Sequence, residues 1–422
     1  MKKITRALCL MLAVILCIGV FAGCHPKDEI ALDFGEYKIF SGTYACAIVQ
    51  ADMEARQNVY NTLSAQEDFD SSKEIDYLKQ KINGVSYSEW VKDRALKMCQ
   101  ELVYIQKKVK EINLKIDEKD VTNAKTYADY NWSTGAQQLL YNANGVAYET
   151  YYNFYFNTVQ MSEYFLSIYG KGGTNAVKEE DVLKALYDNY DLAYYISVSY
   201  TDSEGKERDE DDIKADKALF DSYAEKINKG ELTFKEVEKL WNEETKKREE
   251  EEKKNNSTSS NTSSTTSTTT STPTSSTPAS SNPASSDATS SGTTSSEEPF
   301  SKPADESAYL IGTDETGSNY AFEHFEDVHK LDVGKAVVIE EEGADCMLFV
   351  RGDIKGDYYY EKNYYDSALS ILKYDAFQAD FQKEAYQLEY KENKYATSNF
   401  SAKKVDYTDY NAYQEYMQYY GY

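Results

Sequence analysis

The chain has 422 residues, enough for two or three domains, and 41% of them are hydrophobic, with Tyr alone contributing 39 residues. Its formal net charge is −26, and the rest of the chain is more acidic still once the basic residues 1–23 are set aside. Such a surface repels phosphate backbones and anionic lipid headgroups, which argues against nucleic acid as a partner. It attracts cationic, largely unfolded segments instead.

The first segment is typical of an export signal. Residues 1–23 combine a basic start with an apolar run that is too short for a stable membrane-spanning helix. The tetrapeptide FAGC at residues 21–24 resembles a bacterial lipobox, with Phe where that pattern usually has Leu. The resemblance implies that Cys24 is lipidated and anchors an extracytoplasmic protein to the cell membrane. An ordinary secretory signal cut near Cys24 is the alternative.

The cysteines beyond Cys24 are Cys46, Cys99 and Cys346, and their wide spacing does not match a metal or redox motif. We therefore expect no metal and no cofactor. Cys46 and Cys99 fall in predicted helices, where we interpret them as small core residues. A disulfide between them is compatible with an oxidising compartment, and the sequence leaves it open.

Helical periodicity dominates the next part of the chain. One apolar stripe with alternating steps of four and three consists of Val91, Ala95, Met98, Leu102, Ile105, Val109 and Ile112. The stripe fits a lone coiled coil or a helix clasped by neighbours within one lobe, and the amphipathic segments that follow favour the lobe. A second stripe contains Tyr148, Tyr151, Tyr152 and Tyr155. Because Tyr combines an apolar ring with a polar tip, we interpret these four residues as candidates for binding client chains.

The period then changes to that of a strand. Tyr194, Ile196, Val198 and Tyr200 alternate with Tyr195, Ser197 and Ser199, which predicts a half-buried strand. A charged loop and a helix ending at Gly230 follow. Thr233 and Glu236 then form a capping box at the start of another helix.

A Ser/Thr-rich tract interrupts the chain after this helix. It has almost no apolar residues, so it cannot offset the entropy of ordering, and we expect it to be disordered. Five of the six prolines lie between Pro273 and Pro303. Order resumes with predicted strands near residue 309 and at 335–340 and 345–351, and a long helix follows at 363–390.

The order of these elements resembles the PrsA/SurA group of extracytoplasmic foldases, which carry a parvulin-type prolyl isomerase domain. A helical lobe follows a lipobox. The segment KEEDVLKALYDNYDLAYYISVSY is similar to the entrance of a parvulin domain, and FEDVHKLDVGKAVVIEEEGADCMLFVRGD is similar to its ending. Gly230 and Phe234 match one phrase of the family, and Leu331, Gly334 and Val337 match another.

The resemblance implies an α+β protein in which a mostly helical chaperone lobe carries a small parvulin-like α/β domain interrupted by the tract. Loop closure costs little extra for a long insert whose ends meet, so such an insertion is physically reasonable. The implied divisions are a signal peptide (1–23), a helical lobe (24–190), the first half of the parvulin-like domain (191–250), the insertion (251–304), the second half (305–354), and a long helix returning to the lobe with a Tyr-rich tail (355–422).

The chain departs from the family at the catalytic positions. Parvulins place one His on the first strand and another on the last, but the aligned positions here hold Tyr195 and either Asp345 or Cys346. The resemblance therefore implies isomerase activity that is weak or absent. The histidines are His25, His324 and His329, and the last two are five residues apart, a poor spacing for joint metal binding on a helix. The tripeptide RGD at 351–353 is interpreted as a chance match.

We therefore expect a membrane-anchored folding factor that holds newly secreted or unfolded polypeptides without ATP and does not bind nucleic acid. A cell-surface structural or adhesion lipoprotein is one alternative, because Tyr-rich surfaces also suit a fixed partner. An active peptidyl-prolyl isomerase is the other.

Overall fold

The protein is mostly helical with small antiparallel sheets, an α+β architecture, in a computed structural model. The structure describes residues 29–66, 69–71, 73–134, 136–201, 206–257, 307–317, 319–341 and 345–420. The segment predicted to be an export signal, with Cys24, and the Ser/Thr-rich tract after residue 257 lie outside the described residues. The described chain divides into two compact units, one of residues 29–176 and 373–420 and the other of residues 177–257 and 307–372.

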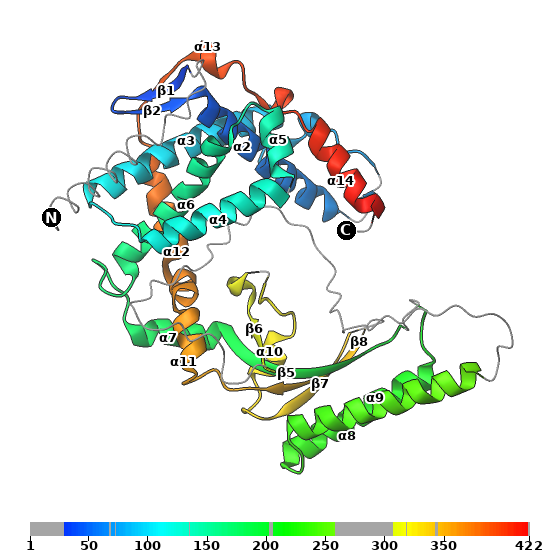
Figure 1. The fold of residues 1–422 in the computed structure, drawn as a ribbon. Helices are drawn as coiled ribbons and strands as arrows, with labels where there is room; N and C mark the ends of the chain where they lie inside the picture. The colour runs from blue at the N-terminus through cyan, green and yellow to red at the C-terminus, as the bar shows by residue number, and fades with distance from the viewer. Residues whose placement is uncertain are drawn as a thin grey trace, which may run out of the picture. The chain divides into compact units, whose positions relative to one another are not determined.

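The first unit is a group of helices with two small sheets (Figure 1). Its helices are α2 (Ser41–Ser64), α3 (Tyr87–Glu111), α4 (Glu118–Thr134), α5 (Gln137–Ala143), α6 (Tyr148–Tyr169), α13 (Lys394–Thr397), α14 (Thr408–Tyr420) and the 3-10 turns η1 (Tyr77–Lys79) and η3 (Ala402–Lys404). Its strands are β1 (Ile30–Phe34), β2 (Tyr37–Phe40), β3 (Lys81–Ile82), β4 (Val85–Ser86) and β9 (Lys391–Glu392). The sheet orders are β2-β1-β9 and β3-β4.

The long apolar stripe lies in α3 and forms the core of the first unit. Val91, Ala95 and Met98 are buried against α2 and the N-terminal strands, as is Leu102 one turn further on. The end of the stripe is not buried: Ile112, which directly follows α3, is 47% exposed. The helix is thus clasped by neighbours, as its context predicted, and is not a lone coiled coil. Cys46 and Cys99 are both buried free thiols.

A buried carboxylate links distant parts of this unit. Asp52 of α2 is 0% exposed, and its Oδ1 accepts a hydrogen bond from the hydroxyl of Tyr87 at 3.0 Å. Its Oδ2 accepts from Arg56 Nε at 2.9 Å and from the hydroxyl of Tyr407 at 3.0 Å. Asp52 therefore ties the segment before α14 to the first two long helices.

The second unit is built around one four-stranded sheet. Its strands are β5 (Tyr190–Ser199), β6 (Tyr309–Gly312), β7 (Ala336–Glu340) and β8 (Asp345–Arg351). Its helices are α7 (Glu179–Asn189), α8 (Glu210–Lys229), α9 (Phe234–Ser257), the 3-10 turn η2 (Asp314–Thr316), α10 (Phe325–His329) and α11 (Tyr358–Asn363). Helix α12 (Tyr365–Ala385) begins in this unit and ends in the first.

The sheet has the order β6-β5-β8-β7, and every neighbouring pair is antiparallel. Strand β5 precedes the Ser/Thr-rich tract in sequence, whereas the other three strands follow it. Because β5 pairs with both β6 and β8, segments from the two sides of the tract form one sheet. The hydrogen-bonded ladders therefore join parts of the chain that are more than a hundred residues apart.

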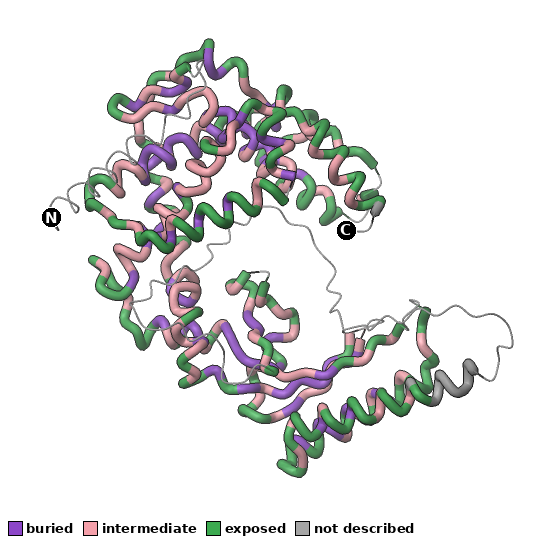
Figure 2. The backbone as a smooth tube through the Cα atoms, in the orientation of Figure 1, coloured by how far each residue is buried: buried purple, intermediate pink, exposed green. Residues whose placement is uncertain are grey.

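The alternation predicted for β5 is confirmed. Ile196 and its even-numbered neighbours pack on the sheet face covered by α8 and α9, where Phe220, Val237 and Leu348 are buried. Tyr195 points to the other face, which meets α10. Figure 2 shows buried residues running along the strands and alternating with exposed ones along α8.

Local signals account for the hairpin of α8 and α9. Gly230 ends α8 in the left-handed conformation, with φ of 74°. The capping box is present, since Glu236 accepts from the backbone of Thr233 at 2.8 Å and Thr233 Oγ1 accepts from Glu236 N at 3.3 Å. Helix α9 continues to Ser257, so residues 251–257 are helical and the predicted start of the insertion at residue 251 is wrong. In the described part of the chain, no helix is both long enough and apolar enough to cross a membrane.

Candidate functional site

The structure separates the residues that the sequence placed at the catalytic positions. Tyr195 pairs across the ladder with Phe349, while Asp345 pairs with Ser199 and Cys346 with Val198. Asp345 therefore lies four ladder positions from Tyr195, a distance of roughly 13 Å along the strand. Cys346 is fully buried on the face covered by α8, where burial raises the pKa of its thiol to about 11. These three residues therefore do not form one site.

Tyr195 instead belongs to a group that we call the sheet-face aromatic cluster: Tyr195, Tyr309, Phe322 and Phe349. The ring centroid of Tyr195 lies 4.7 Å from that of Tyr309 and 5.5 Å from that of Phe349. Phe322 lies 5.0 Å from Phe349. Phe349 is buried, whereas Tyr309 is 54% exposed and the other two are half-buried. The cluster thus presents a partly accessible apolar surface.

This cluster is suited to apolar contact and not to proton transfer. Burial raises the pKa of the Tyr195 phenol above its ordinary value of 10.0, so the group stays neutral at physiological pH. Aromatic rings with accessible faces and edges bind apolar side chains and prolyl rings through area burial and ring stacking. Met347, which is half-buried beside the cluster, adds a flexible apolar side chain.

Both histidines near the cluster have structural neighbours. His329 stacks on Phe325 at 4.9 Å, and its Nδ1 lies 2.9 Å from Asp191 Oδ2. His324 Nδ1 lies 3.6 Å from Asp327 Oδ2, beyond hydrogen-bond distance. Among the described residues, no group of three or more His, Cys, Asp or Glu could hold a metal ion.

The RGD tripeptide has a structural explanation. Arg351 Nε lies 2.7 Å from Asp191 Oδ2 in an ion pair, and Arg351 Nη1 donates to the carbonyl of Leu331. A Cβ at Gly352 would lie 2.7 Å from the side chain of Leu192, so only glycine fits. The arginine is thus held within the unit and is not presented as part of an extended adhesion loop.

The four tyrosines predicted to bind clients all lie on α6 and face α4 or α5. Tyr151 is enclosed between Trp132 and Tyr141, at 5.2 and 5.0 Å between centroids. Tyr148 packs edge-on against Trp132 and donates to Asp129. The structure therefore gives these two tyrosines neighbours that hold α4, α5 and α6 together.

The other two tyrosines are half-buried and stack on aromatic neighbours. Tyr152 stacks on Phe156 at 5.9 Å, and Tyr155 stacks on Tyr127 at 5.4 Å. Tyr127 is 45% exposed and Tyr130, also on α4, is 62% exposed. Figure 2 shows the largely exposed course of α4. Sequence reasoning missed Tyr127 and Tyr130, although their spacing of three residues places them on one helix face.

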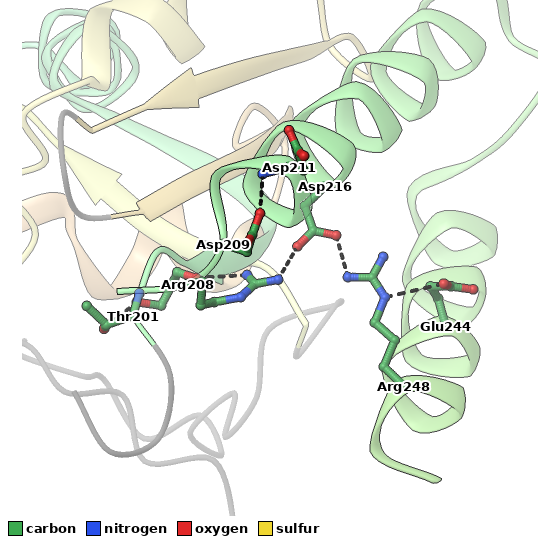
Figure 3. A network of polar contacts seen from close by, with 8 residues as sticks. Thr201, Arg208, Asp209, Asp211, Asp216, Glu244 and Arg248 are labelled. Atoms are coloured by element: carbon green, nitrogen blue, oxygen red, sulfur yellow. Dashed lines mark hydrogen bonds and ion pairs between the residues drawn. The ribbon is translucent and has the colours of Figure 1, made fainter. Parts of the chain in front are cut away.

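A charged cluster joins the loop after β5 to α8 and α9 (Figure 3). Asp216 of α8 is 0% exposed, and it accepts hydrogen bonds from Arg208 Nη2 at 2.7 Å and from Arg248 Nη1. Arg208 Nη1 also donates to the carbonyl of Ser199 at 3.0 Å, and Arg248 Nε to Glu244 at 3.3 Å. The sequence analysis missed this cluster; its signal is an acidic residue on the apolar stripe of Asp216, Phe220, Tyr223 and Ile227.

Comparison with known proteins adds no relative, because the chain matches no protein-family model, no curated protein and no solved structure. Function is therefore argued from the surfaces described above.

Proposed function

We propose that this chain is a lipid-anchored extracytoplasmic folding factor that holds newly secreted polypeptides, with a parvulin-like domain of weak or absent isomerase activity. The observation that carries the proposal is the sheet-face aromatic cluster. Tyr195, at the position where the parvulin resemblance expects a His, lies in a group of four aromatic rings that ranges from the buried Phe349 to the exposed Tyr309. A site of this kind is better suited to reversible binding of apolar side chains than to catalysis.

The charge of the chain supports the same function. At −26 overall, the protein attracts basic, unfolded segments and keeps its own copies apart. The acidic surface and the exposed rings of Tyr127 and Tyr130 together suit weak contacts with many chains, because neither requires a particular client sequence. Release then needs no ATP, since contacts of this kind are individually weak.

Suppression of aggregation tests the holding function. The chain lacking residues 1–23 is mixed with a chemically denatured single-domain client that is diluted out of denaturant, and light scattering is followed. We expect scattering to fall as the protein approaches equimolar amounts, and Tyr309→Ala to weaken the effect. Tyr395→Ala is the matched control, because Tyr395 is 74% exposed but lies in the first unit. No suppression by the unmodified chain contradicts the proposal.

A proline-limited refolding assay tests the catalytic part of the proposal. Uncatalysed prolyl isomerisation takes tens of seconds or longer, so acceleration is easy to detect. We expect little or no acceleration at equimolar protein. Clear acceleration that Tyr195→Phe abolishes would establish an active isomerase in which the Tyr195 hydroxyl takes part.

The lipid anchor is tested separately. Cys24→Ser removes the thiol that the lipobox resemblance implies is modified. We expect the unmodified protein to fractionate with membranes and to carry a mass increase at its N-terminus, and the variant to lose both. A soluble unmodified protein cut near residue 24 would favour the ordinary secretory signal.

A further inference from the structure

Strand β5 is longer than the strand that covers its outer edge. Strand β6 pairs with residues 190–193 only, whereas β8 pairs with residues 193–199 on the opposite edge. Beyond Ala193, the outer edge of β5 has no strand partner among the described residues. On this outer edge, about half of β5 therefore has no hydrogen-bonded strand beside it in the described chain.

Alternation identifies the backbone groups on this open edge. In an antiparallel ladder, successive residues direct their N–H and C=O groups to opposite sides. The carbonyl of Leu192 accepts from Gly352 N at 2.7 Å, on the β8 side, so the groups of Tyr195 and Ser197 are directed to the open side. Arg208 donates to the carbonyl of Ser199 and closes the far end. Within the described chain, the outward backbone groups of Tyr195 and Ser197 have no hydrogen-bond partner.

Residues 194–199 of β5 contain no lysine, proline or bulge. Proteins cover exposed edges with lysines, prolines or bulges that prevent another chain from pairing. The ladder between β5 and β8 runs from Ala193 to Ser199 without a register shift. Ser197 is exposed, with a small side chain beside the free backbone groups. The sheet-face aromatic cluster borders the same stretch through Tyr195.

We propose that an extended segment of an unfolded polypeptide binds this edge as an added strand, with its backbone hydrogen-bonded to Tyr195 and Ser197. Two residues that each offer one donor and one acceptor at strand spacing match an extended peptide backbone. Alternate side chains of the added segment contact the sheet-face aromatic cluster. This inference rests on the proposed holding function and deepens it, because main-chain pairing explains how one site accepts clients of different sequence.

A pair of probe peptides tests strand addition on the unmodified chain. The first is an unstructured heptapeptide, acetyl-Lys-Thr-Val-Tyr-Val-Thr-Lys-amide, and the second is the same peptide N-methylated at its central three residues. N-methylation removes backbone donors and leaves the side chains in place. We expect the first to bind at least tenfold more tightly in a titration followed by fluorescence anisotropy. Equal affinities overturn the proposal.

Variants of Ser197 locate the binding edge. Ser197→Pro removes an N–H that faces away from β8, so the ladder keeps its hydrogen bonds while the edge is blocked. Ser197→Ala is the matched control, which keeps the N–H. We expect at least tenfold weaker binding for the proline variant and unchanged binding for the alanine variant, with circular dichroism checking the fold. Unchanged binding by a folded proline variant overturns the assignment to this edge.

The same variants distinguish this inference from the proposed function. If Ser197→Pro loses peptide binding but still suppresses aggregation, holding does not require the edge, and strand addition as its mechanism is wrong. If the unmodified chain binds neither peptide yet suppresses aggregation, the proposed strand addition is wrong, whereas the proposed holding function is supported. If deletion of residues 258–300 tightens peptide binding tenfold or more, the edge belongs to the chain's own segment, which overturns the assignment to a client.

Discussion

The two faces of the four-stranded sheet use similar apolar residues but have different surroundings. On one face, Leu348 and Val350 of β8 are covered by α8 and α9 and are nearly inaccessible. On the other, Phe349 of the same strand is also buried, in a core cluster with Ile339 of β7 and with α10, whereas Met347 stays half-exposed. The comparison teaches that strand alternation supplies two apolar faces, and that the elements covering them decide how much of each face is buried.

Adjacent residues of β8 provide the strongest test of this comparison. Leu348→Ala empties a site that is 0% exposed, and we expect a loss of about 3 to 4 kcal/mol in the free energy of unfolding. Met347→Ala on the open face is the matched control, with an expected loss of about 1 kcal/mol. Urea denaturation followed by the fluorescence of Trp241, with the other two tryptophans replaced by Phe, measures both. Similar losses would show that both faces are core.

The buried carboxylate of Asp216 is expected to have the next largest effect. Asp216→Asn removes the buried carboxylate that Arg208 and Arg248 share, although Arg248 keeps its ion pair with Glu244, and the two arginine side chains are 21% and 36% exposed. Because water can reach both guanidinium groups, we expect the free energy of unfolding to fall by about 2 kcal/mol, which is less than for a fully buried ion pair. The same denaturation experiment measures it. A coupling energy near zero between Asp216→Asn and Arg248→Met would contradict the role of this pair in holding α9.

On the open face, a large aromatic residue is expected to contribute little to stability. Tyr309 is 54% exposed, so Tyr309→Ala should lower the free energy of unfolding by only about 0.5 to 1 kcal/mol. Its effect on client holding should be larger, because the ring lies at the accessible edge of the sheet-face aromatic cluster. Thermal melting and the aggregation assay are compared on the same variant. A large loss of stability together with unchanged suppression of aggregation would show that Tyr309 contributes to the core and not to client binding.

The smallest effect on stability is expected from a substitution of Glu340, the last residue of β7, which accepts hydrogen bonds from Lys217 and Tyr200. These bonds lower the pKa of Glu340 below its ordinary value of 4.5, so their stabilisation is present above that pH and is lost as the pH falls through the lower folded value. The carboxylate is 42% exposed, and solvent screening limits the effect of Glu340→Gln at pH 7 to no more than about 0.5 kcal/mol. The variant and the unmodified chain should be equally stable near pH 3. A difference that persists there would point to packing and not to charge.

Much of the secondary structure could be predicted because local chemistry determines it. The alternation around Tyr195, the stop at Gly230, and the capping box of Thr233 and Glu236 depend on neighbouring residues and are present in the structure. The site was harder to predict. Tyr195 was correctly assigned to a strand, but its ladder partner, Phe349, could not be predicted, because register depends on how two distant strands align.

The sequence by itself determined the net negative charge, the helical periodicities and the change of period at β5. Only the tertiary structure decided that β5 pairs with strands from beyond the tract and that β6 stops short of its full length. It also decided which carboxylates are buried, since Asp52, Asp191 and Asp216 gain their partners from other elements. Propensity and periodicity act between residues close in sequence, whereas pairing, register and burial depend on contacts between residues far apart along the chain.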